Sequence, residues 1–166
     1  MREDSQDNGF PSPPPVQQAG GRPLLRRLLR VGLSTLCGVE LILGIWTQFF
    51  PLSFYTTVPT VDLTPPYSEH LMRDFGGATL GIAVVLGVAA ITLNRLVVTC
   101  ALAAYLVFAV PHFIFHVGHL EHFSPAEATG LTAVLAASLV VAGGLLIAHV
   151  VETKRDSHDL RYPPLG

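Results

Sequence analysis

Four long apolar stretches, separated by short polar connectors, dominate the pattern of this chain. They cover residues 31–50, 75–93, 96–116 and 127–150. Each is close to the ~20 residues, or roughly 30 Å of helix, that cross the hydrocarbon core of a bilayer. Buried β-strands are also continuously apolar, but they usually have only about 4–8 residues. The pattern therefore predicts an all-α membrane protein, an up-down bundle of four transmembrane helices.

The connectors predict where these helices begin and how they pair. Ser124, Pro125 and Glu127 have the residue types and spacing of an N-cap, a first helical residue and the acidic partner of a capping box. Residues 94–95 leave so little chain between the second and third helices that the two must be antiparallel neighbours. The loop 51–70 contains four prolines, which argue against a regular helix there.

Glycines indicate where helices can approach one another closely. Gly77 and Gly81 form a GxxxG pair on the second helix, and Gly143 and Gly144 lie on the fourth. Small residues at such positions let the backbones of two membrane helices come together.

The chain divides into a transmembrane domain, 22–151, and two polar tails. Residues 1–21 are Pro-rich and nearly free of apolar residues, which predicts a disordered cytoplasmic tail. Residues 152–166 predict a second polar cytoplasmic tail, expected to be mobile. No small-residue cleavage site follows the first apolar run, so we interpret it as a retained helix rather than a signal peptide.

Charge sets the expected orientation. The basic residues gather on one side of an even-numbered bundle, with Arg73 alone on the other. The positive-inside rule then places both termini in the cytoplasm. One lysine against nine arginines indicates a GC-rich bacterial genome, and hence the bacterial cytoplasmic membrane. The basic residues on the predicted inner side are Arg22, Arg26, Arg27, Arg30, Arg95, Lys154, Arg155 and Arg161.

Composition excludes some functions. Half of the residues are hydrophobic, 13% are charged, and the net charge is −2. Basic residues in belts beside the apolar runs are not a nucleic-acid signature. The two cysteines, Cys37 and Cys100, both lie inside apolar runs. They form no CxxC motif and suggest no disulfide framework.

The stretch HFIFHVGHLEH, 112–122, contains four of the seven histidines. His112 and His116 are one helical turn apart, a spacing at which two imidazoles can share a metal ion. His119 would follow on the same face if the helix continued. Glu69 and His70, at the outer end of the second helix, could add ligands. The alternatives are a proton-handling cluster, or histidines that line the membrane interface and bind only water and loop backbone. No cofactor is predicted by a motif, and the histidines would accommodate a transition metal.

Glu40 lies near the middle of the first apolar run. An ionised carboxylate at that depth costs about 2.5–3.5 kcal/mol even on the lenient insertion scale. It should therefore face the bundle interior, where Tyr105 and Ser138 lie at a similar depth. The alternatives are a functional proton site and a structural hydrogen bond between helices.

Arg73 is the only basic residue on the predicted outer side. It could pair with Asp62, Glu69 or Asp74, or hold an anionic headgroup or substrate. With Glu40, Asp74 and Tyr105 it completes the candidate polar site. A local ion pair at the rim is the structural alternative.

Two segments resemble a known group of proteins. They are YSEHLMRDFGGATLGIAVVL, 67–86, and YLVFAVPHFIFHVGHLEHFSPAEA, 105–128. They resemble a family of uncharacterised membrane proteins of high-GC bacteria, itself loosely similar to DoxX-like four-helix proteins. The resemblance covers roughly residues 24–150. DoxX-like members are linked to quinone or thiol redox complexes, so it implies a component of such a complex, but it transfers no catalytic residue.

Two classes of function follow. The first is a non-enzymatic accessory or scaffold component of a membrane complex, in contact with the bilayer and with partner proteins or other copies of itself. The second is a protein whose outward-facing histidine and acid cluster binds a transition metal, or relays protons in a redox or transport process. The direction in which His112 and His116 point distinguishes them.

Overall fold

The computed structural model describes residues 21–63 and 66–161. The predicted disordered tail, 1–21, lies outside the described residues except for Gly21, which begins the first helix. The last five residues of the chain, 162–166, lie outside them too.

All regular structure in the described residues is helical, as predicted. The four long helices α1, α3, α4 and α5 are long and apolar enough to cross a membrane, and they pack as a bundle. The chain is therefore an integral membrane protein with four candidate spanning helices. The elements are α1 (Gly21–Phe49), α2 (Pro51–Thr57), the 3-10 turn η1 (Val61–Leu63), α3 (Glu69–Thr92), α4 (Arg95–Val117) and α5 (Pro125–Arg161).

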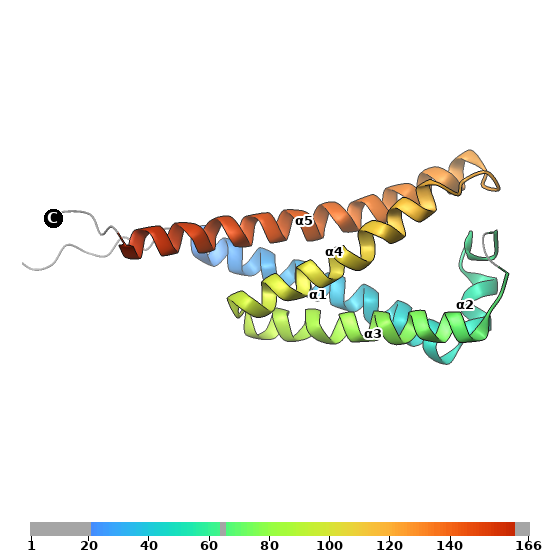
Figure 1. Ribbon diagram of the computed structural model, residues 1–166, viewed down its shortest axis with the longest axis horizontal. Coiled ribbons are helices and arrows are strands. Elements are labelled where there is room, and N and C mark those ends of the chain that lie inside the picture. The colour runs from blue at the N-terminus through green and yellow to red at the C-terminus, as the bar shows by residue number, and fades with distance from the viewer. Residues whose placement is uncertain (1–20, 64–65, 162–166) are drawn as a thin grey trace, which may run out of the picture.

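The bundle consists of two antiparallel hairpins (Figure 1). One contains α1 and α3, and the other contains α4 and α5. At the end of the bundle that we call the basic end, α1 begins, α3 turns into α4, and α5 finishes. At the opposite end, the loop end, lie α2, η1 and the turn at 118–124.

The hairpins stay together at the basic end and separate toward the loop end. Helix α4 leaves α3 obliquely, while α2 contacts only α1, α3 and η1 (Figure 1). Helix α5 contacts α4 and α1 but not α3. Only 11% of its most apolar 18-residue segment is buried, against 28–33% of the corresponding segments of the other three spanning helices. Helix α5 is therefore the least enclosed member of the bundle.

The predicted start of the fourth helix is confirmed by its capping hydrogen bonds, whereas α1 and α3 begin before the predicted spans, at Gly21 and Glu69. The backbone N–H of Ser124 donates to Glu127 Oε2 at 2.9 Å, and the Glu127 N–H donates to Ser124 Oγ at 3.4 Å, which is a complete capping box. Ser68 accepts from the Leu71 N–H at the start of α3. Asn94 accepts from two N–H groups at the start of α4, so the turn from α3 to α4 is as tight as the sequence indicates.

The predicted absence of a helix in the loop 51–70 was wrong for its first part, where α2 forms. Pro51 is the first residue of α2, a position at which its missing N–H costs no hydrogen bond. The buried Phe54 packs edge-on against Trp46, with ring centroids 5.6 Å apart. Trp46 Nε1 also donates to Ser53 Oγ at 3.2 Å. These contacts fold α2 back onto the end of α1.

Helix α5 runs past its predicted end at residue 150 to Arg161. Residues 151–161 contain neither glycine nor proline, and several are good helix formers. The first ten residues of the polar tail 152–166 are therefore helical.

Within the bundle, the predicted close approach of another backbone is not formed at Gly77–Gly81 or at Gly143–Gly144. A methyl group at Gly77 would lie 3.6 Å from Gln48 Oε1, an ordinary side-chain contact. Among the described residues, nothing lies within 4 Å of where a methyl group would stand at Gly81, Gly143 or Gly144. The close approach involves the neighbouring Gly76, which is buried. A methyl group there would lie 2.6 Å from the backbone nitrogen of Gln48 in α1.

A second glycine contributes to the same interface from the opposite helix. A methyl group at Gly44 would lie 2.8 Å from Leu80 Cγ and 3.0 Å from the Leu80 backbone nitrogen. Glycines on both helices thus bring α1 and α3 together on the loop-end side of the bundle.

Gly76→Ala should destabilise the protein by about 1–3 kcal/mol, because the new methyl group would press on the backbone of α1. Gly81→Ala is the matched control, and it should leave stability equal or slightly higher because alanine favours a helix over glycine. Thermal unfolding of both variants in the same detergent measures the difference. Equal melting temperatures for the two variants would contradict the predicted contact.

Candidate functional site

Glu40 is buried in the middle of the bundle, with 5% of its surface exposed. Its side chain lines a cavity of about 110 Å³ between α1, α3, α4 and α5. The other polar residues that line this cavity are Tyr105, His112 and Ser138, and the remaining walls are apolar. The structure thus brings Glu40 together with the two residues, Tyr105 and Ser138, that the sequence places at its depth.

The Tyr105 hydroxyl lies beside Ser138 and within electrostatic range of the Glu40 carboxylate. Ser138 Oγ itself donates to the Leu135 carbonyl at 2.8 Å. No hydrogen bond to Glu40 from a described residue is present. Because a water needs about 10–15 Å³ of such a cavity, the space beside Glu40 can admit several waters. The carboxyl group therefore faces a polar cavity inside an apolar bundle.

His112 forms the wall of this cavity toward the loop end. Its ring stacks on Phe108, with centroids 5.7 Å apart, and on Phe75 of α3 at 6.0 Å. Helix α4 continues through Pro111, so Phe108 and His112 are one turn apart on the same face. The His112 side chain thus points into the bundle and not toward lipid.

His116 extends this polar row by one turn. Its ring meets that of His112 edge-on at 4.6 Å, and both side chains are half-buried. The Nδ1 atom of His116 is buried and has no hydrogen-bond partner among the described residues. Glu40, the cavity, His112 and His116 therefore form a continuous row from the middle of α1 toward the loop end.

His119 does not continue the row, because α4 ends at Val117. It lies in the following turn, where its ring stacks on Phe115 at 4.2 Å and its Nδ1 lies 2.7 Å from the Phe115 carbonyl oxygen. His122 lies further along the same turn and is exposed. The single histidine face expected from a longer helix is therefore not formed.

The charged residues at the start of α3 form two local pairs. Arg73 contacts Glu69, with Nη2 and Oε1 2.8 Å apart, and it also donates from Nη1 to the Gln48 carbonyl in the last turn of α1. His70 Nε2 lies 3.3 Å from Asp74 Oδ2, and both side chains are largely exposed. Arg73 thus ties α3 to α1, while Asp74 stays outside the cavity.

The predicted metal ligands are divided among these groups. Within residues 21–63 and 66–155, no three His, Cys, Asp or Glu side chains lie close enough to hold a metal ion together. Cys37 donates to the Ala83 carbonyl at 3.2 Å, and Cys100 is exposed. The closest pairing of the proposed ligands is His112 with His116.

Sequence reasoning missed the aromatic residues that orient His112. Phe108 could have been found, because it precedes His112 by four residues on the same helix. Phe75 could not, since its contact depends on how α3 and α4 are aligned at their loop ends. Gln48 was missed for the same reason.

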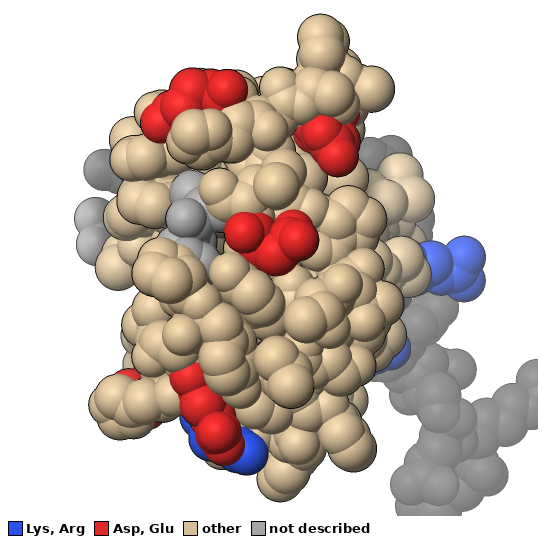
Figure 2. Space-filling model, turned by 90° about the vertical axis from the view of Figure 1, so that its right-hand side faces the viewer, with Lys and Arg blue, Asp and Glu red and all other residues tan. Residues whose placement is uncertain are grey.

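The loop end carries more acidic than basic groups. Viewed from this end, the acidic side chains lie in separate places and do not form one patch (Figure 2). Among the described residues, the basic side chain at this end is Arg73. The acidic residues of the connectors and helix ends there are Asp62, Glu69, Asp74, Glu121 and Glu127. This end therefore presents separate carboxylates, two of which pair with Arg73 and His70.

Helix length, hydropathy and packing together define a small multi-pass integral membrane protein. No protein-family model, curated protein or solved structure matches the chain. These comparisons identify no family and do not support the resemblance to DoxX-like proteins.

Arg73→Met should lower the free energy of unfolding by about 1–3 kcal/mol, because it leaves the Gln48 carbonyl without its donor. Asp74→Asn is the control. It removes only an exposed pair, so its effect should stay within about 0.5 kcal/mol. Chemical unfolding in mixed micelles compares the two. An Arg73→Met variant with the same free energy of unfolding as the wild type would show that Arg73 does not hold α3 to α1.

Proposed function

We propose that this protein carries a proton-accepting site, in which Glu40 takes up and releases a proton through His112 and His116 as part of a membrane redox or transport process. The observation that carries the proposal is the placement of the Glu40 carboxyl in a cavity whose loop-end wall is His112. An ionisable side chain inside a membrane helix is costly and is by default a functional candidate.

The environment of Glu40 links its protonation to the contents of the cavity. Without compensation, the neutral acid is the cheaper form in a bundle of apolar helices. Water beside Glu40, together with the hydroxyl of Tyr105, would stabilise the carboxylate. Any change that fills or empties the cavity would therefore move the proton.

Histidine suits the step between the cavity and the loop end. Imidazole accepts a proton on one nitrogen and releases one from the other near neutral pH. The Nδ1 of His116 is buried and has no hydrogen-bond partner among the described residues, so it could accept a proton. The edge-on contact with His112 makes the two rings neighbours in one row.

We further propose that the loop end faces the outside of a bacterial cytoplasmic membrane, with both termini inside. The support is the charge asymmetry of the bundle. Short loops rich in arginine or lysine stay in the cytoplasm, and the basic end matches that description. Its described basic residues are Arg26, Arg27, Arg30, Arg95, Lys154 and Arg155.

Infrared difference spectroscopy of the protein in nanodiscs tests the proton site. As pH is changed, the wild type should show a carbonyl band of a buried, protonated carboxyl group. Glu40→Gln should abolish this band, because it replaces the only buried carboxyl group among the described residues. Glu127→Gln, at the exposed capping box, is the control and should leave the band unchanged. A wild type without a titrating band would disprove the proposal.

His112→Phe should slow the protonation of Glu40 after an external pH jump by about tenfold or more, since a positioned proton donor contributes rate factors of this order. Phenylalanine keeps the ring stacked between Phe75 and Phe108. The control is His119→Phe, which lies outside the row and should leave the rate unchanged. Equal rates in all three proteins would exclude the histidine path.

Metal binding by the histidines is decided in the same preparation. Elemental analysis of purified wild type and of the His112→Ala/His116→Ala double variant should find no stoichiometric metal in either. If the wild type contains stoichiometric metal and the double variant does not, the histidines form a metal site and the proposed proton path is wrong. His119, Glu69 and His70 would then be tested as further ligands.

The second candidate is an accessory or scaffold role in a membrane complex, without chemistry of its own. It is favoured by the low burial of α5 and by small residues along the exposed face of that helix. Small residues allow another helix to approach closely in a membrane. The exposed small residues on this face are Gly130, Ala133, Ala137, Gly144 and Ala148, and the exposed Val134 and Val141 lie beside them. A transmembrane helix of a partner protein or of a second copy would fit this face.

Gly144→Leu should break such an assembly while leaving the bundle intact, because no other described part of the bundle lies within 4 Å of where a methyl group would stand at Gly144. Ile147→Phe adds bulk beside the small-residue face and serves as the control. Native gel migration of mildly solubilised membranes reports the assembly. If both variants migrate like the wild type, α5 does not mediate an assembly.

A further inference from the structure

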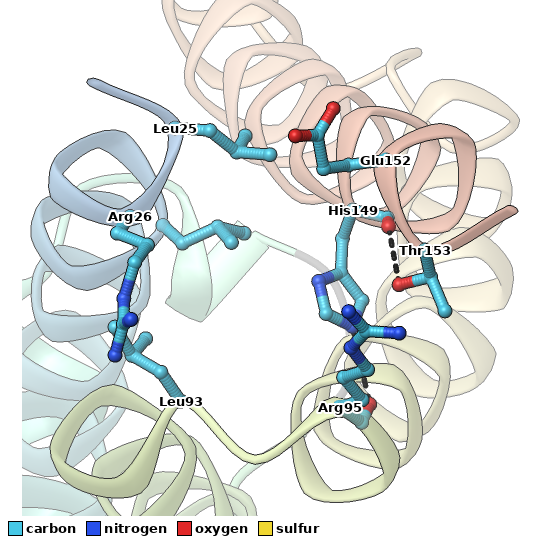
Figure 3. A pocket seen from close by; sticks show the side chains of 8 residues that line it. Leu25, Arg26, Leu93, Arg95, His149, Glu152 and Thr153 are labelled. Carbon is cyan, nitrogen blue, oxygen red and sulfur yellow. Dashed lines mark hydrogen bonds between the residues drawn. The ribbon is translucent and has the colours of Figure 1, made fainter. Parts of the chain in front are cut away.

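A second cavity, of about 290 Å³, opens at the basic end. It lies between the start of α1, the turn from α3 to α4, and the end of α5 (Figure 3). Its polar lining consists of Arg26, Arg95, His149, Glu152 and Thr153. Arg26 and Arg95 stand on opposite sides of the opening (Figure 3). Two cations from different helices thus face one space.

The wall that carries Arg95 is fixed by hydrogen bonds. His149 is buried, with 6% of its surface exposed, and its Nε2 lies 3.1 Å from the Arg95 carbonyl oxygen. Thr153 Oγ1 donates to the His149 carbonyl at 2.9 Å. The contact from His149 holds the end of α5 against the start of α4, whereas the Thr153 bond lies within α5. The wall of the cavity is therefore positioned by a buried side chain.

The rest of the lining is apolar and comes from Leu25, Leu29 and Leu93. Outside the cavity, Leu24 and Leu28 expose 61% and 53% of their surfaces on α1. Guanidinium groups therefore stand beside an apolar wall that continues onto the outer surface of the helix. A ligand that matches both parts is charged at one end and apolar along its length.

We infer that this cavity binds the phosphate group of an anionic phospholipid. Arg26 and Arg95 would hold the phosphate from opposite sides, because guanidinium groups form paired hydrogen bonds with phosphate oxygens. The leucines would contact the glycerol and the first carbons of the acyl chains. Basic pockets between membrane helices are a recognised setting for such headgroups.

The charges that line the cavity predict which substitutions should strengthen the binding of an anionic lipid and which should weaken it. Arg26 and Arg95 bring two positive charges to the lining of the cavity, and Glu152 brings one negative charge. Glu152 should oppose the phosphate. Replacing it with glutamine should therefore tighten binding, whereas replacing the arginines should weaken it.

The inference is independent of the proposed proton site. No residue that lines the Glu40 cavity also lines this one. Loss of lipid binding and loss of the Glu40 band would consequently be separate results.

Native mass spectrometry of the full-length protein, released from detergent with added phosphatidylglycerol, tests the inference. The wild type should retain one phosphatidylglycerol molecule in preference to phosphatidylcholine. Arg26→Gln/Arg95→Gln should weaken this binding by about tenfold or more, the loss expected for charge-assisted contacts to phosphate. Glu152→Gln should strengthen it.

Arg27→Gln/Arg155→Gln is the matched control. It removes two positive charges from the same end without touching the cavity lining, so it should leave the preference intact. Should the double cavity variant fold poorly, the single variant Arg26→Gln replaces it, because Arg26 is exposed. Arg26→Lys/Arg95→Lys, which keeps the charge but loses the guanidinium geometry, should bind with intermediate strength.

Two results would overturn the inference. Equal weakening by the cavity and control pairs would show a diffuse attraction to the basic end and no site. Retention of phosphatidylcholine as strongly as phosphatidylglycerol would remove the anion requirement. A parallel titration with inorganic phosphate should give no stable adduct. A phosphate adduct as stable as the phosphatidylglycerol adduct would show that the cavity binds free phosphate and not a phospholipid.

Discussion

The backbone contact between α1 and α3 at Gly76 is the constraint on which the rest of the bundle depends. Lipid tails are as apolar as leucine side chains, so the hydrophobic effect does not drive spanning helices together within a bilayer. Van der Waals packing and hydrogen bonds must do so instead. The glycines at positions 44 and 76 allow the closest approach, and Arg73 adds a hydrogen bond to the end of α1. The pair α1–α3 is thus the more closely packed half of the protein.

The second hairpin is fixed differently, and this difference accounts for the cavity beside Glu40. Helices α4 and α5 are held at the basic end by the tight turn at Asn94 and by the contact from His149 to Arg95. Toward the loop end they diverge from α1 and α3, and aromatic rings around His112 fill only part of the space. The polar groups of the Glu40 cavity therefore lie where packing between the hairpins is incomplete.

Much of the fold could be predicted from the sequence, because the length of each apolar run and the residues that cap each helix are local properties of the chain. Apolar length set the four spanning helices, and capping residues such as Ser124 set where they begin. The errors have equally local or geometric reasons. Helix α2 was missed because prolines were counted without regard to Pro51 being a first helical residue, and α5 was ended where hydrophobicity ends although helix propensity continues.

The candidate site was only partly predictable for a different reason. The position of each residue along its predicted spanning helix placed Tyr105 and Ser138 at the depth of Glu40. That position does not show which way the side chain points around the helix axis. Which of Gly76 and Gly77 meets α1, and whether Phe75 meets His112, depends on how each helix is turned about its axis. Where a helix stops is similarly decisive, since the end of α4 at Val117 separates His119 from His112 and His116.

The length of α5 has a mechanical consequence. Its 37 residues extend about 55 Å at 1.5 Å per residue, well beyond the ~30 Å hydrocarbon core. Because the contact from His149 to Arg95 holds α5 to α4 at the basic end, a tilt of α5 pivots there. A tilt of about 10° would move its loop end, roughly 36 Å away at 1.5 Å per residue, sideways by about 6 Å. The space between the hairpins at the loop end would therefore change while the packing at the basic end stays in place.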